Sequence, residues 1–155
     1  MLIELDNRHP RRRVDQTGLR RRLARVLRAQ GCPEASELSV VLVDDPAMAE
    51  LNQRHMDRRG PTNVLAFPMD AAAGLGDEPA DGAPYLLGDV VVSLDTAARE
   101  AAEHQLEPGE HLVRLLIHGL LHLLGHDHLP SAEAARRMEE LTERLLLLSR
   151  ADEEE

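Results

Sequence analysis

The 155-residue chain has almost no aromatic side chains, no lysine and a single cysteine, Cys32. Phe67 and Tyr85 are the only aromatic residues, which excludes a platform of aromatic rings as the main means of binding nucleic-acid bases. No apolar run reaches the length of a membrane span, and Met1 to Arg13 lack the apolar stretch of a signal peptide. A lone cysteine fits a reducing compartment, so we expect a cytoplasmic protein without a membrane partner.

Charge is distributed unevenly along the chain. The formal net charge is -10, which by itself argues against a nucleic-acid partner. All 18 basic residues are arginines, however, and nine of them lie between Arg8 and Arg28. From Leu19 to Arg28 arginines alternate with apolar residues at helical spacing, which predicts a helix with one core face and one basic face. The basic face is then either solvated surface or a docking surface for nucleic acid.

Residues 118–128, HGLLHLLGHDH, carry the strongest pattern in the chain. His118 and His122 are four residues apart and share one face of a helix, close enough for both imidazoles to bind one ion. A continuing helix would turn His128 away from them, so the chain must reverse, and Gly125 is suited to that turn. Nearly all the remaining residues of the helix are apolar, which predicts that the helix is buried. The sequence therefore predicts a metal site made of His118, His122 and His128.

Three imidazoles with one open position are typical of a catalytic zinc site, and we expect one Zn²⁺ per chain, with another divalent transition metal as the alternative. The spacing also matches the metzincin peptidase pattern H-E-x-x-H-x-x-G-x-x-H. Gly119, however, replaces the glutamate that acts there as general base, which disfavours a peptidase. Asp127 is a candidate catalytic residue that would orient an imidazole, assist proton transfer, or only cap the turn, in that order.

The histidine run resembles the signature H-G-x-L-H-L-x-G-y-D-H of the YbeY family. Residues 61–67, PTNVLAF, are similar to the family block P-T-[DN]-V-L-S-F, and residues 87–90, LGDV, to L-G-D-I. The resemblance implies a metal-dependent endoribonuclease that is directed at single strands and acts in 16S ribosomal RNA maturation and ribosome quality control. It also implies a four-stranded sheet with the metal site in a cleft along its edge, and as partners ribosomal RNA, the small ribosomal subunit and ribosome-assembly proteins.

Two positions depart from the family pattern. Met56 stands where many members have an arginine thought to contact RNA phosphate, and Ala66 replaces the usual serine. Arg54, Arg58 and Arg59 flank Met56, and they either supply the missing phosphate contact or are solvated surface.

The expected fold is α+β, with a small mixed sheet covered by helices and a zincin-like metal helix. Residues 1–150 are expected to form one domain and residues 151–155 an acidic tail. Two other functions stay open, namely a zincin-like hydrolase such as a peptidase and a non-catalytic ribosome-assembly factor with a structural metal. The expected strands are residues 2–6, 38–43, 64–67 and 86–94. The expected helices are residues 17–30, residues 46–55, a helix capped by Asp95 that runs to about His104, a metal helix that Pro108 and Gly109 separate from it, and a last helix capped by Ser131.

Overall fold

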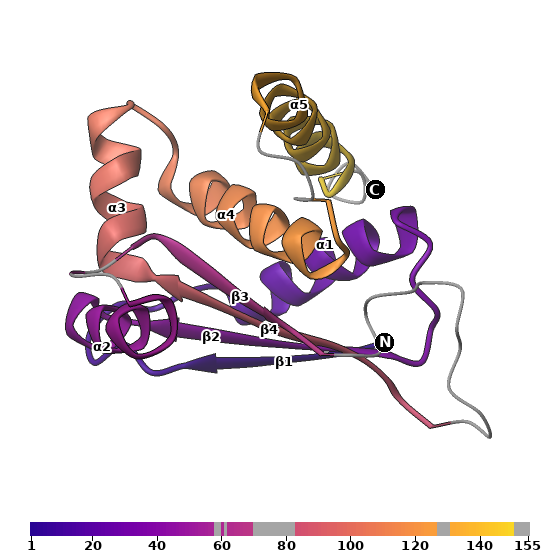
Figure 1. The fold of residues 1–155 in the computed structure, drawn as a ribbon, viewed down its shortest axis with the longest axis horizontal. Helices are drawn as coiled ribbons and strands as arrows, with labels where there is room; N and C mark the ends of the chain where they lie inside the picture. The colour runs from indigo at the N-terminus through magenta and orange to yellow at the C-terminus, as the bar shows by residue number, and fades with distance from the viewer. Residues whose placement is uncertain (58–59, 61, 70–82, 127–130, 151–155) are drawn as a thin grey trace.

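The computed structural model describes residues 1–57, 60, 62–69, 83–126 and 131–150, and Figure 1 shows how their elements are arranged. The strands and helices follow one another in the predicted order, which confirms the α+β class. Their bounds are β1 Leu2–Asn7, α1 Gln16–Ala29, β2 Ser36–Val43, α2 Asp45–Met56, β3 Val64–Pro68, β4 Tyr85–Ser93, α3 Leu94–Glu103, α4 Pro108–Leu123 and α5 Ala132–Leu148. None of the helices in these described ranges is long and apolar enough to cross a membrane.

The four strands form one mixed sheet in the order β1-β2-β4-β3. β1 pairs parallel with β2, β2 pairs parallel with β4, and β3 pairs antiparallel with β4, so β3 is an edge strand. At the start of β3 the carbonyl of Asn63 accepts a hydrogen bond from the Ser93 N–H at 3.0 Å. Because antiparallel pairing alternates along a strand, the backbone groups of Val64, Ala66 and Pro68 point away from β4. The predicted four-stranded mixed sheet is confirmed.

Helices cover the two faces of the sheet unequally. α1, α3, α4 and α5 lie on one face, whereas α2 lies against the other face at one end (Figure 1). The main core fills the space between the sheet and the first group of helices, and α4 is its centre because it is buried on most sides. A smaller core lies beneath α2. Fully or almost fully buried residues of the main core include Leu23, Val26, Val40, Leu42, Leu87, Leu116, Ile117 and Leu120, and the smaller core contains Val43, Met48, Leu65 and Val91.

Two helix starts differ from the prediction. The cap of α3 is Ser93, whose Oγ accepts the N–H of Thr96 at 3.3 Å, and not Asp95. Asp95 lies in the first turn, where its carboxylate accepts hydrogen bonds from other elements instead. Pro108 and Gly109 do not separate α4 from α3 but form its first turn, with Glu107 as the cap. Proline fits this position because the first N–H groups of a helix have no partner within it.

The basic face of α1 is largely used inside the protein. Arg22 is buried and forms two hydrogen bonds with the Glu110 carboxylate at 3.1 and 2.9 Å, and a third with the Ser149 hydroxyl at 3.0 Å. Arg25 donates to the backbone carbonyl of Ser149. These arginines therefore join α1 to the start of α4 and the end of α5. The predicted core face of α1, Leu19, Leu23, Val26 and Leu27, is confirmed, whereas Arg22 of the predicted basic face is buried and not part of the surface.

Candidate metal centre

His118 and His122 face each other on the last turns of α4. Their Nε2 atoms are 2.9 Å apart, and their ring centroids are 4.5 Å apart with the rings inclined at 74°. Two imidazole nitrogens at this distance share either a proton or a cation. Zinc bound tetrahedrally at about 2.0–2.1 Å from each nitrogen would place them about 3.3 Å apart, so a small ring rotation suffices. The pair therefore fits two ligands of one ion.

The helix ends in a turn directly after this pair, as predicted. Gly125 has a φ of +88°, in the left-handed region that glycine adopts at low cost. Its N–H donates to the His122 carbonyl at 3.0 Å, and the His126 N–H donates to the Leu121 carbonyl at 3.0 Å. These two bonds define a Schellman motif, which ends a helix. The predicted role of Gly125 as a helix terminator is confirmed.

The third predicted ligand, His128, and the candidate catalytic residue Asp127 lie outside the described residues. Within the ranges that the structure describes, no group of three potential metal ligands occurs. The ring of His126 is directed to α1, where its Nε2 lies 3.2 Å from the Gln30 side-chain oxygen. The described part of the site is therefore the His118 and His122 pair together with the turn that follows it.

Two glycines allow α4 to lie very close to the sheet. A Cβ atom on Gly119 would lie 2.6 Å from Val90 Cγ1 and 3.0 Å from Val64 Cγ2. A Cβ atom on Gly88, which has a φ of +134°, would lie 3.1 Å from Leu123 Cδ2 of α4. These contacts involve the two other sequence blocks, residues 61–67 and 87–90. Residues of both blocks therefore pack directly against the histidine helix.

The position of Gly119 also bears on the peptidase alternative. A glutamate there would have to place its Cβ inside the contact radius of Val90 and Val64, because the Gly119 face of α4 is pressed against β3 and β4. The helix cannot carry the general base of the metzincin pattern at this position without moving off the sheet. The structure therefore gives a steric reason for glycine in addition to the chemical one.

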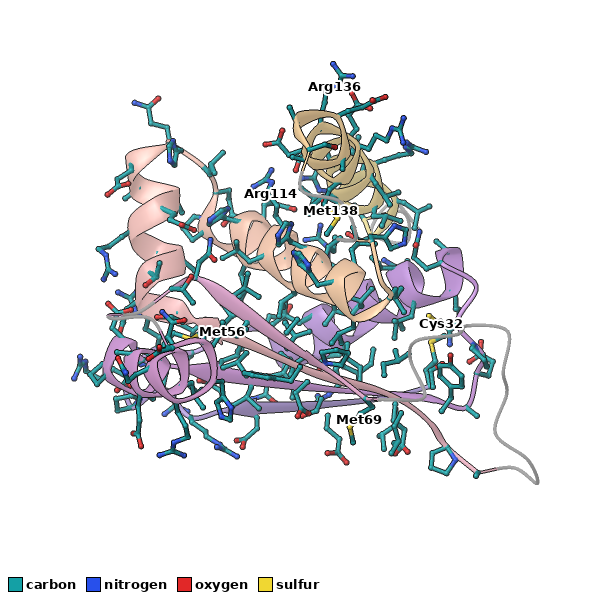
Figure 2. The ribbon with its side chains drawn as sticks, in the orientation of Figure 1. Cys32, Met56, Met69, Arg114, Arg136 and Met138 are labelled. Atoms are coloured by element: carbon teal, nitrogen blue, oxygen red, sulfur yellow. The ribbon has the colours of Figure 1, made fainter. Side chains whose placement is uncertain are left out.

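A polar network on the first half of α4 was not predicted from the sequence. The Asn63 side-chain amide donates to the Glu100 carboxylate at 3.1 Å, and the His111 Nε2 lies 2.9 Å from the same carboxylate. Arg114 approaches the His111 Nδ1 at 3.4 Å and pairs with Glu143 of α5 at 2.6 Å, so it spans from α4 to α5 (Figure 2). His111 precedes His118 by seven residues. This spacing puts both histidines on about the same face of the helix, and it could have identified His111 from the sequence.

Arg54, one of the three predicted RNA-binding arginines, lies on another part of the molecule. Arg54 is in the last turn of α2 and pairs with Glu50 at 2.6 Å, with both side chains more than 60% exposed. Met56 ends the same helix and is exposed (Figure 2). The His55 ring packs edge-on against Phe67 at 5.2 Å, so α2 contacts β3 from the face opposite α4. Arg58 and Arg59 lie outside the described residues.

Comparisons with known proteins cover nearly the whole chain. Residues 4–149 match the family described as Endoribonuclease YbeY. A protein named Endoribonuclease YbeY from Syntrophotalea carbinolica is 41% identical over 139 residues, which cover 89% of each chain. Another of this name from Geobacter metallireducens is 42% identical over 142 residues, covering 90% of this chain and 89% of the relative.

A solved structure shares the fold. The solution structure of TM1509 from Thermotoga maritima superimposes with a TM-score of 0.66, at 21% identity, over 97% of this chain and 91% of the other. This likeness agrees with the sheet and helix arrangement described above, and it is independent of close sequence similarity. The family match over residues 4–149 and the relatives of 41% and 42% identity show that the chain is a member of the endoribonuclease YbeY family.

Proposed function

We propose that the protein is a metal-dependent endoribonuclease that cleaves single-stranded segments of ribosomal RNA in 16S rRNA maturation and ribosome quality control. The observation that carries the proposal is the convergence of His118 and His122 at 2.9 Å, directly before the turn at Gly125 that ends α4. Relatives that are more than 40% identical over about nine tenths of this chain are named endoribonucleases, which supports RNA as the substrate.

His118, His122 and His128 would hold the ion, and nitrogen ligands of this number favour zinc. When bound, zinc supplies Lewis-acid stabilisation of the charge that develops on the scissile phosphodiester. The protein's own contribution is rigidity, because α4 is buried and fixed to the sheet through Gly119. Asp127, next to the third ligand in sequence, would orient an imidazole by hydrogen bonding.

Substrate binding would involve Arg54, Arg58 and Arg59. They would make the phosphate contact of the arginine that many family members have at the position of Met56. The pair between Arg54 and Glu50 is exposed, so exchanging the carboxylate for a phosphate costs little. An RNA strand that touches both α2 and the histidine pair must pass around the edge strand β3, because the two lie on opposite faces of it. The setting would be the cytoplasm, with the small ribosomal subunit and its assembly proteins as partners.

The test uses purified protein of measured metal content, incubated with a 16S rRNA precursor with and without a chelator. We expect cleavage that requires the metal and is lost in His118→Ala, while His126→Ala serves as the matched histidine control. Cleavage that survives both the chelator and His118→Ala would contradict the proposal. Casein in a parallel assay tests the peptidase alternative. A histidine variant that unfolds, rather than losing cleavage selectively, would favour the assembly factor with a structural metal.

A further inference from the structure

The loop between β1 and α1 has four arginines within residues 8–13, called here the arginine loop. Its backbone is held from the inside by hydrogen bonds. The Asn7 side chain accepts the N–H of His9 at 3.0 Å and donates to the carbonyl of Arg12 at 2.8 Å. The Nδ1 atom of the buried His9 accepts the N–H groups of Arg11 and Arg12, both at 3.0 Å. The arginines therefore project from a backbone that is already ordered.

The same histidine ties the loop to the rest of the protein. Because Nδ1 of His9 accepts two N–H groups, the ring hydrogen is on Nε2, which donates to Asp95 at 2.8 Å. Asp95 also accepts the N–H of Asp45 at the start of α2, at 3.0 Å. The arginine loop is thus anchored at the point where α2 and α3 begin.

Two arginines of this loop keep an uncompensated charge. Arg8 pairs with Asp6 and Arg12 with Asp95, whereas Arg11 and Arg13 are exposed and form no ion pair with the described residues. The nearest remaining carboxylate in sequence, Asp15, caps α1 and is offset by the positive end of that helix. Many arginines elsewhere are paired with acids, namely Arg22, Arg28, Arg54, Arg99, Arg114, Arg137 and Arg150.

Two hollows flank the arginine loop. One, of about 370 Å³, is lined by Arg12 and Arg13 together with Pro108 and Gly109 from the start of α4. The other, of about 400 Å³, is lined by Arg11 and Arg13 and by residues up to the first turn of α1. The arginine loop thus lines hollows on two sides, one of which it shares with the start of α4. Since α4 rises about 1.5 Å per residue, its histidine pair lies about 15–21 Å further along the helix axis from this start.

We propose that the arginine loop binds the phosphate backbone of the RNA outside the segment that is cleaved, as a second contact. The inference rests on the proposed function. The planar guanidinium group matches a phosphate in a bidentate manner, and an ordered loop loses little entropy on binding. At about 3.4 Å per phosphate along one strand of a duplex, a length of about 15–21 Å spans about four to six phosphates. The loop therefore favours long RNA substrates over short ones.

The experiment compares two double variants of the metal-loaded protein. Arg11→Ala with Arg13→Ala removes the free charges of the loop. Arg136→Ala with Arg144→Ala is the matched control, since these arginines of α5 are equally exposed and without ion pairs to described residues, and Arg136 points away from the sheet (Figure 2). Binding is measured by fluorescence anisotropy against salt, with a short oligonucleotide that cannot span both places and with a longer RNA that can.

We expect the loop variant to bind the longer RNA on the order of tenfold more weakly than wild type, with a shallower salt dependence, because two phosphate contacts are lost. Its binding of the short oligonucleotide, its metal content and its melting temperature should match those of the control. Equal weakening in both double variants, or none in the loop variant, would overturn the inference while leaving the proposed function intact.

Two further outcomes have distinct meanings. Loop-dependent binding of polyglutamate without loop-dependent binding of RNA would identify an acidic protein as the partner and overturn the inference. Wild-type protein that neither binds nor cuts the short oligonucleotide would instead defeat the proposed function itself, and with it the inference.

Discussion

Gly119 of α4 lies so close to Val90 of β4 that a methyl group on it would be 2.6 Å from Val90 Cγ1. Replacing Gly119 with alanine should therefore destabilise the fold by about 1–3 kcal/mol through overpacking, although alanine favours a helix. Gly109→Ala on the same helix is the control, because its new methyl group would meet the flexible end of Glu107. Urea unfolding of both variants checks this. Equal stability of the two would contradict the close packing.

Metal binding should require three histidines and no others. His118→Ala, His122→Ala and His128→Ala should each lose the single bound zinc, since two remaining imidazoles hold the ion weakly. His126→Ala should retain it, because that ring contacts Gln30 of α1. Metal content after gel filtration measures the effect. Loss of zinc in the His126 variant with retention in the His128 variant would reverse the assignment.

Arg22 should matter for stability rather than for RNA. Replacing Arg22 with alanine leaves the Glu110 carboxylate partly buried with fewer hydrogen-bond donors. This should lower the free energy of unfolding by about 3 kcal/mol. The neighbouring Arg21 is exposed, so Arg21→Ala should change the free energy of unfolding by less than about 0.5 kcal/mol. Chemical denaturation distinguishes the two variants, and equal effects would mean that the ion pair between α1 and α4 adds nothing.

Acid should weaken the anchor formed by Asp95. Partial burial acts to raise the pKa of Asp95, but hydrogen bonds from Asp45, His9 and Arg12 outweigh it and lower the pKa from 3.8 to about 2. The ionised carboxylate therefore stabilises the fold above about pH 4, and the contribution is lost as the pH falls towards 2. The difference in melting temperature between wild type and Asp95→Asn should accordingly shrink over this range. A constant difference would show that charge is not involved.

The arginines around Met56 offer a test of substrate binding at α2. A variant in which Arg54, Arg58 and Arg59 are all alanine should bind single-stranded RNA more weakly and with a flatter salt dependence, since fewer counterions are released. Metal content should not change. An unchanged salt dependence would mean that these side chains are only solvated.

The sequence predicted the parts of the site that depend on local spacing. Helix geometry predicts that His118 and His122 face each other, and the backbone freedom of glycine predicts the turn at Gly125. Both features are present. Elements were also predicted in the right order, because each has a continuous apolar pattern of its own.

What the sequence could not predict depends on residues far apart in the chain. Arg22 has the pattern of a solvated arginine, and its burial depends on Glu110, 88 positions away. Asp95 is a good cap by residue type, but Ser93 takes that role while Asp95 meets His9, 86 positions away. A local pattern contains no information about such partners.

The edge strand β3 has a consequence for how the protein behaves at high concentration. A free strand edge can pair with the same edge of another molecule and start aggregation. On β3, however, the Val64 N–H is bound by the Asn63 side chain at 2.7 Å, and Pro68 has no N–H to offer. Two of the three outward positions of β3 therefore offer no N–H to a second chain, which disfavours edge-to-edge pairing of two molecules through this strand.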